Sequence, residues 1–137
     1  MIAKAYLQRR VRAMQAKTIL VVEDHAPTRE AYVAFLVECG YRVIAAAHGG
    51  EAILHVHRYH PDLVLMDINM PVLDGIETAE SLRAHVPAAG LRIVALTGCE
   101  SQVKRERMHA VCDDVLQKPC APELITSRIQ SLIGMAS

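Results

Sequence analysis

Five short apolar runs alternate with five segments of helical spacing, and this alternation constrains the fold more than any other feature of the chain. Each run is rich in β-branched or other apolar residues, as strands buried on both faces are. Between and after the runs, apolar residues recur at the i, i+3, i+4 and i+7 spacing of a buried helix face. The predicted strands span residues 18–22, 41–46, 63–67, 92–97 and 115–118.

Proline and glycine mark where the predicted helices begin and end. The helix after the first strand begins near Pro27, where a missing N–H costs little, and ends at Gly40. The next helix ends before Pro61, and Asp74 before Gly75 is expected to form a turn or a helix cap. We expect the five helices near residues 27–39, 50–59, 76–82, 101–110 and 125–133.

Five βα units in about 120 residues predict an α/β fold with a parallel sheet and helices on both faces, because crossovers between parallel strands are right-handed. The simplest choice is a flavodoxin-like, doubly wound (βα)5 arrangement with five strands in the order 2-1-3-4-5. Ligands of such sheets bind beyond the carboxyl ends of the strands, where the strand order reverses. The ends of the first and third strands should therefore meet at the functional site.

Polar residues stand at the carboxyl ends of four predicted strands. Glu23 and Asp24 follow the first strand, Asp67 ends the third within LVLMDINMPVLDG, Thr97 ends the fourth and Lys118 the fifth. Crowded carboxylates raise one another's pKa unless a cation neutralises them, and Mg²⁺ prefers such oxygen ligands. One carboxylate can then act as a nucleophile, while the hydroxyl and the ammonium stabilise a transferred phosphoryl group.

In this order and spacing, the motifs resemble those of the receiver domain of two-component response regulators. The matching stretches are ILVVED, LVLMDINMPVLDG, VALTG and DDVLQKP. The resemblance implies a signalling switch that accepts a phosphoryl group from a histidine kinase or a histidine phosphotransfer protein and slowly hydrolyses it. Such a protein catalyses its own phosphorylation and dephosphorylation without turnover of a free substrate.

The resemblance also implies roles for the residues that bind the phosphoryl group. Asp67 would be the phosphoacceptor, Lys118 would pair with the phosphoryl group, and Thr97 would hydrogen-bond it as the switch hydroxyl. The bond between Lys118 and Pro119 is expected to be cis. Asn69 and Cys99 flank the site and are expected to tune hydrolysis of the phosphoryl group.

The metal ligands follow from the same resemblance. Asp24 and Asp67 would coordinate Mg²⁺ directly, together with the backbone carbonyl of Asn69, and Glu23 would act through a water on the metal.

Three alternative classes of protein make different demands on the sequence. A haloacid dehalogenase-type phosphatase would need a second acid where Asn69 stands. A flavin carrier would need a Gly/Ser/Thr-rich phosphate loop in place of EDHAPTRE, and a receiver that works without phosphorylation commonly loses an acid or the lysine.

Two positions depart from the family pattern. Three residues before the lysine, where the family often has Tyr or Phe, this chain has Val115. A valine cannot swing a large ring between exposed and buried positions, so activation is expected to proceed without an aromatic switch. Cys120 also replaces the aromatic residue common after Lys-Pro.

A downstream target would bind the face made by the helix at 101–110, the strand at 115–118 and the last helix.

The first 17 residues differ in charge from the rest of the chain. They carry five basic residues and no acid, so the other 120 residues have a net charge of −5. Apolar residues from Ala3 to Met14 recur at helical spacing. We expect a basic helical extension at 1–17, either a linker end or a binding arm for an acidic surface, ahead of a receiver domain at 18–137. The segment is too short and too poor in aromatics for nucleic-acid binding.

Other features exclude further classes of site and compartment. The four cysteines form no C-x-x-C pair, which argues against a zinc site or a disulfide framework. His55 does not share a helix face with His57 and His60, so a histidine metal site is not expected. No apolar run approaches a membrane span or resembles a signal peptide, so we expect a cytoplasmic protein.

The protein is interpreted as a single-domain, chemotaxis-regulator-like response regulator, or else as a receiver excised from a hybrid histidine kinase or multidomain regulator.

Overall fold

The computed structural model describes residues 1–70, 74–85, 90–98 and 101–136, with the side chains of residues 12–15 outside the description. The strands are β1 (Thr18–Val22), β2 (Arg42–Ala46), β3 (Leu63–Asp67), β4 (Arg92–Thr97) and β5 (Asp114–Gln117). The helices are α1 (Ile2–Gln15), α2 (Ala26–Glu38), α3 (Gly49–Tyr59), α4 (Gly75–His85), α5 (Gln102–Val111) and α6 (Pro122–Ile133).

The five strands form one parallel sheet in the order β2-β1-β3-β4-β5. This confirms the predicted flavodoxin-like α/β fold with its strand order. Val22 at the end of β1 is paired with Met66 in β3, so the residues that follow these strands emerge side by side. The point where the strand order reverses therefore lies between Glu23 and Asp67, as the alternation of elements predicted.

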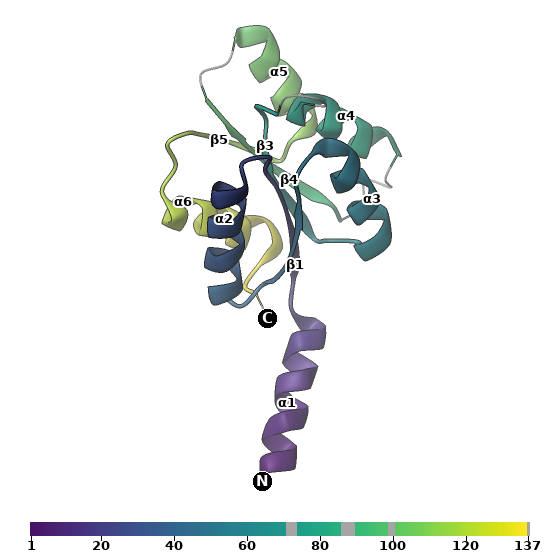
Figure 1. Cartoon of the computed structure of the whole chain (residues 1–137), viewed down its shortest axis with the longest axis vertical. Coiled ribbons are helices and arrows are strands. Elements are labelled where there is room, and N and C mark those ends of the chain that lie inside the picture. Colours follow the sequence, from purple (N-terminus) through teal and green to yellow (C-terminus); the bar gives the residue numbers. More distant parts are fainter. Residues whose placement is uncertain (71–73, 86–89, 99–100, 137) are drawn as a thin grey trace.

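Two apolar layers hold the helices against the sheet. On one face, alternate residues such as Leu20 and Met66 pack with α3 and α4, and Ala95 packs with Met108 of α5. On the other face, residues such as Ile19 and Leu65 pack with α2 and α6. These side chains are fully or almost fully buried, and each leucine, isoleucine or methionine among them contributes roughly 1.5–3 kcal/mol when removed from water. Figure 1 shows the helices flanking the sheet on both sides.

The predicted boundaries differ from the observed ones by one residue in two strands. Strand β2 begins at Arg42 rather than Tyr41, because the Tyr41 N–H donates to Leu36 O in the turn that ends α2. Strand β5 runs one residue earlier than expected, and Asp114 is paired with Val94. Helix α2 ends at Glu38, and Cys39 is its C-cap with an exposed side chain.

The start of α4 is fixed closely against the end of β3. Asp74 caps the helix, since its Oδ1 accepts a hydrogen bond of 2.9 Å from the Glu77 N–H, and this confirms the capping role expected for it. A Cβ on Gly75 would lie 2.6 Å from the carbonyl oxygen of Asp67 and 2.7 Å from the Cα of Ile68. Only glycine permits this approach, so the sequence Asp-Gly positions α4 beside the strand that carries Asp67.

Helix α1 extends away from the sheet, and Figure 1 shows it leaving the rest of the structure at the N-terminal end. Its apolar side chains Ile2, Tyr6, Leu7 and Val11 are all exposed. Among the described residues, no helix is long and apolar enough to cross a membrane.

Candidate functional site

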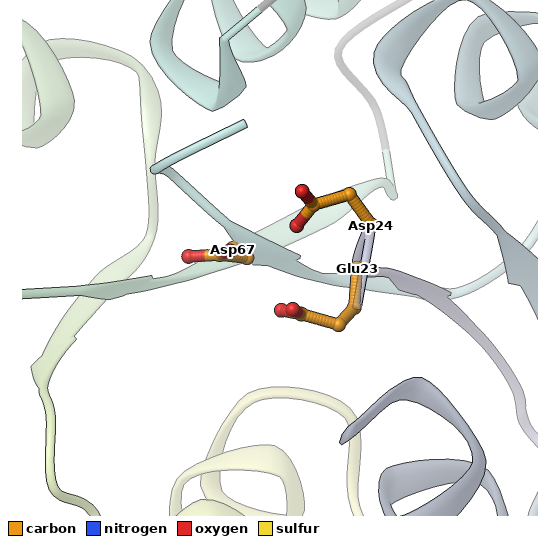
Figure 2. A group of neighbouring side chains, drawn as sticks. All are labelled: Glu23, Asp24 and Asp67. Atoms are coloured by element: carbon orange, nitrogen blue, oxygen red, sulfur yellow. The ribbon is translucent and has the colours of Figure 1, made fainter. Parts of the chain in front are cut away.

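Three carboxylates converge at the carboxyl ends of β1 and β3. One carboxylate oxygen from each of Glu23, Asp24 and Asp67 lies within 4.8 Å of the other two. Figure 2 shows Glu23 and Asp24 on the segment after β1, with Asp67 beside them at the end of β3. Glu23 and Asp67 are each 4% exposed, whereas Asp24 is open to solvent. The site therefore has a buried floor and an accessible mouth.

Backbone hydrogen bonds fix the two strand ends that carry these acids. The Glu23 N–H donates to Ala46 O at 3.1 Å, which extends the pairing of β1 with β2 by one residue. The Ile68 N–H donates to Leu96 O at 3.0 Å, so β3 continues past Asp67 along β4. Glu23 and Asp67 are thus held at the hydrogen-bonded edge of the sheet, and Asp24 follows Glu23 in the loop after β1.

Asp67 is bonded to the lysine that follows β5. The Lys118 Nζ donates to Asp67 Oδ1 at 2.8 Å, and the Asn69 N–H donates to the same oxygen at 3.2 Å. Burial alone would lower the pKa of Lys118. The hydrogen bond to Asp67 and the charge of Asp67 outweigh burial and raise this pKa above its ordinary value. The Lys118–Pro119 bond is cis, as the resemblance implied. Lys118 is therefore a charged ammonium directed at Asp67.

Glu23 has the most perturbed carboxyl group of the site. Burial and the charge of Asp67 raise the pKa of Glu23 from 4.5 to about 7. Its Oε1 accepts a hydrogen bond from the His25 N–H at 3.3 Å, but its buried Oε2 has no partner among the described residues. A buried carboxylate oxygen without a partner is unfavourable unless a cation or a proton satisfies it. This donor set of three carboxylates fits a hard divalent cation such as Mg²⁺.

Arg29 supports the acidic loop in a way the sequence pattern did not reveal. Its guanidinium Nη1 donates to the carbonyl oxygens of Glu23 at 2.9 Å and Asp24 at 3.4 Å. The only sequence signal for this contact is that Arg29 lies within the first turns of the helix that follows the two acids. The contact holds the backbone of the loop from α2, so both acids point toward Asp67.

Thr97 lies at the end of β4, as predicted, but the structure does not join its hydroxyl to Asp67. The side chain is buried, and its Oγ1 has no hydrogen-bond partner in the part of the chain that the structure describes. The neighbouring Gly98 N–H donates to Asn69 Oδ1 at 3.4 Å, which links the end of β4 to the loop after β3. Cys99 lies outside the described residues.

A cavity of about 460 Å³ opens above the acidic site. Two of its lining residues, Asp74 at the start of α4 and Lys104 in α5, were not among the predicted site residues. Both residues lie several positions after the nearest strand end in the sequence. The rule that ligands bind at the carboxyl ends of the strands therefore does not identify them. The described residues that line the cavity are Asp24, Ile68, Asn69, Met70, Asp74 and Lys104.

The described residues include no second group of three metal-ligating side chains besides the acidic one. His55 lies 3.8 Å from Glu51, and His48 lies 3.9 Å from the same carboxylate, which makes a local pairing on α3 rather than a metal site. Cys39, Cys112 and Cys120 are free thiols. For Cys112, burial raises the thiol pKa to about 12, so this cysteine is an inert core residue.

The parallel sheet carries three acids, a lysine and a buried threonine at its carboxyl edge, which is the arrangement that the resemblance to receiver domains implied. Residues 19–130 match the family described as the response regulator receiver domain, and the chain belongs to that family. Receiver domains of this family serve two-component signalling, in which they interact with histidine kinases and downstream targets. Mg²⁺ binding is typical of them.

The comparisons include both separate receivers and parts of longer proteins. The chain is 35% identical to the "Probable transcriptional regulator ycf27" of Porphyridium aerugineum over 88% of its own length and 49% of that protein, so it spans about half of this relative. Chemotaxis protein CheY4 of Vibrio cholerae has a TM-score of 0.79 and 29% identity, covering 86% of this chain and 99% of CheY4.

One solved relative contains the metal. The receiver domain of sensor histidine kinase PA1611 from Pseudomonas aeruginosa PAO1 has a magnesium ion coordinated in its active-site cleft. It is 34% identical to this chain, with a TM-score of 0.78, and covers 87% of this chain and 98% of its own.

Proposed function

We propose that the chain is a phosphorylation-dependent signalling switch in which Asp67 accepts a phosphoryl group from a histidine kinase or a histidine phosphotransfer protein. The observation that carries the proposal is the Lys118–Asp67 pair of 2.8 Å beside the buried Glu23 and the exposed Asp24. An ammonium bonded to a carboxylate within an acidic site suits the binding of a phosphoryl group, which carries negative charge on three oxygens.

The proposed reaction transfers phosphorus between two nucleophiles. An Asp67 carboxylate oxygen forms a bond to phosphorus while the P–N bond of the donor phosphohistidine breaks, and the departing imidazole takes the electron pair of that bond. Lys118 stabilises the negative charge on the phosphoryl oxygens, and the Thr97 hydroxyl can donate a hydrogen bond to one of them after a rotation of its side chain. Attack of water on the same phosphorus regenerates the Asp67 carboxylate and releases phosphate.

The residues that would hold Mg²⁺ are Asp24, Asp67 and the backbone carbonyl of Asn69, with Glu23 in support. When bound, Mg²⁺ would neutralise the carboxylates and the charge on the transferred group. The unpartnered Oε2 of Glu23 and the raised pKa of this residue support that assignment, because both indicate a site with excess negative charge.

A cytoplasmic location and a target-binding face are parts of this proposal. The free thiols of Cys39, Cys112 and Cys120 suit a reducing compartment. We assign target binding to the face made by α5, β5 and α6, since Thr97 at the end of β4 lies next to it and lines a cavity together with residues of α5 and β5. The residues of α1 are proposed as a separate extension before the domain.

The direct test is the intact mass of the protein after incubation with acetyl phosphate, with and without Mg²⁺. The proposal expects one phosphoryl adduct in the wild type with Mg²⁺, and none in Asp67→Asn or without the metal. A folded protein that forms no adduct, or an Asp67→Asn variant that forms the same adduct, would contradict the proposal.

A further inference from the structure

A cavity of about 170 Å³ lies between α5 and β5. Its lining consists of Thr97, Gly98, Arg105, His109, Val115 and Gln117. Val115 and Gln117 alternate with Leu116, which packs on the opposite face of the sheet, so both belong to the face of β5 turned toward α5. Because residue 115 is a valine and no larger side chain, the chain itself leaves this space open.

The two basic side chains at this cavity, Arg105 and His109, are paired with no acid of the described residues. Arg105 and His109 are four residues apart and therefore share a face of α5. Neither side chain makes a hydrogen bond or an ion pair with any described residue. Arg107 on the same helix differs, since its guanidinium is paired with Glu80 of α4 at 2.5 Å. No described carboxylate lines the cavity. Asp114 of β5 is instead paired with Arg128 of α6 at 2.9 Å.

One lining residue, Thr97, has a buried hydroxyl that lacks a hydrogen-bond partner among the described residues. Thr97 is 4% exposed, and its Oγ1 makes no hydrogen bond to any described residue. A buried polar group without a hydrogen bond destabilises the folded protein by roughly 1–3 kcal/mol. A ligand oxygen that reached this hydroxyl would satisfy it, while the Arg105 guanidinium would supply a permanent positive charge at the mouth.

We propose that this cavity binds the carboxylate side chain of an acidic residue from a partner protein. The carboxylate would lie between Arg105 and His109, with Gln117 and the Thr97 hydroxyl as further hydrogen-bonding groups, and its methylene carbons would contact Val115. Charge complementarity favours an acid over an aromatic side chain, because the described lining residues offer two basic groups and no carboxylate. The inference adds the chemistry of the partner to the proposed target-binding face, and its link to signalling rests on the proposed function.

The test uses the unphosphorylated full chain, so its result does not depend on whether Asp67 accepts a phosphoryl group. The probe is glutamate blocked at both ends, N-acetylglutamate N-methylamide, and the blocked glutamine of the same shape is its neutral control. Binding is followed by two-dimensional NMR. We expect saturable shifts at the amides of Gly98, Val115 and Gln117, with a dissociation constant on the order of 1–10 mM for so small a ligand.

A pair of matched variants decides whether the cavity is responsible. Arg105→Gln should weaken binding of blocked glutamate roughly tenfold, as loss of one charge-assisted hydrogen bond does. Arg42→Gln removes the same charge from β2, at the opposite edge of the sheet, and should leave the affinity unchanged. Equal shifts with blocked glutamine, shifts confined to other residues, or equal losses in both variants would overturn the proposal. Retention of the amide spectrum shows that each variant is folded.

Discussion

The Lys118 ammonium lies 2.8 Å from Oδ1 of Asp67, so the last strand of the sheet and the central strand are joined by a charged hydrogen bond at the site. We predict that Lys118→Met reduces the initial rate of phosphorylation by acetyl phosphate by about 10- to 100-fold. Loss of about 1.4 kcal/mol of transition-state stabilisation corresponds to a factor of ten. Intact-mass time courses measure the rate. Lys4→Met in α1 is the control, and an equal rate in Lys118→Met and the control would refute the role of the lysine.

Magnesium should stabilise the folded protein, because it would relieve the repulsion among three carboxylates that lie within 4.8 Å of one another. We expect saturating Mg²⁺ to raise the free energy of unfolding by about 1–3 kcal/mol, as ligands selective for the folded state do. Thermal denaturation with Mg²⁺ and with EDTA measures the difference. The Asp24→Asn variant should lose most of the increase, whereas Glu30→Gln on the exposed side of α2 should keep it. The same increase in Asp24→Asn would place the metal elsewhere.

The raised pKa of Glu23 makes the stability of the metal-free protein depend on pH. In the folded protein the pKa of this carboxyl is about 7, so it keeps its proton up to about pH 7. In the unfolded chain the carboxyl has its ordinary pKa of 4.5 and loses the proton near that pH. Since the folded state binds more protons within this window, the free energy of unfolding should fall as the pH rises from about 4.5 to 7. The decrease attributable to Glu23 is up to about 3 kcal/mol.

Urea denaturation in EDTA at pH 5 and pH 8 measures this pH dependence. Other groups titrate in the same range, so the comparison that isolates Glu23 is the one between the wild type and Glu23→Gln. The variant should show a smaller decrease in stability between the two pH values. If its decrease equals that of the wild type, the pKa of Glu23 is not raised in the metal-free protein.

The contact of Gly75 with the end of β3 predicts a large effect of one added methyl group. A Cβ there would lie 2.6 Å from Asp67 O, and backbone atoms cannot yield as a flexible side chain can. We expect Gly75→Ala to destabilise the protein by roughly 2–4 kcal/mol and to slow phosphorylation, because the strand that carries Asp67 must shift. Gly50→Ala in α3, whose Cβ would meet only the His48 ring at 3.4 Å, should change stability by less than about 1 kcal/mol. Urea denaturation of both variants tests this, and equal effects would contradict it.

Much of the fold followed from local patterns in the sequence. Buried parallel strands have a strong apolar signal, and a run such as LVLMD fixes both the strand and the residue that follows it. The rule for parallel sheets then gave the neighbours Glu23, Asp24 and Asp67. The strand ends differed by a residue because turn hydrogen bonds, such as that of the Tyr41 N–H with Leu36 O, are not visible in hydrophobicity.

What the sequence pattern did not provide were contacts made between elements distant from the strand ends. Arg29 bonds backbone carbonyls from within a helix, and Lys104 reaches the cavity above the acids from α5. Such contacts depend on how the helices pack, which periodicity does not encode. The cavity beside Thr97 is of the same kind, since it arises where α5 and β5 leave space over Val115.

The measurement that tests the central claim most directly is reductive trapping of the phosphorylated protein. Sodium borohydride reduces an aspartyl phosphate to homoserine, and peptide mass spectrometry then identifies the position. After incubation with acetyl phosphate and Mg²⁺, we expect homoserine at position 67 and at no other aspartate, and about 10- to 100-fold less of it in Lys118→Met at early times. Homoserine at Asp24 or at another position, or its absence from a protein that carries the phosphoryl adduct, would contradict Asp67 as the phosphoacceptor.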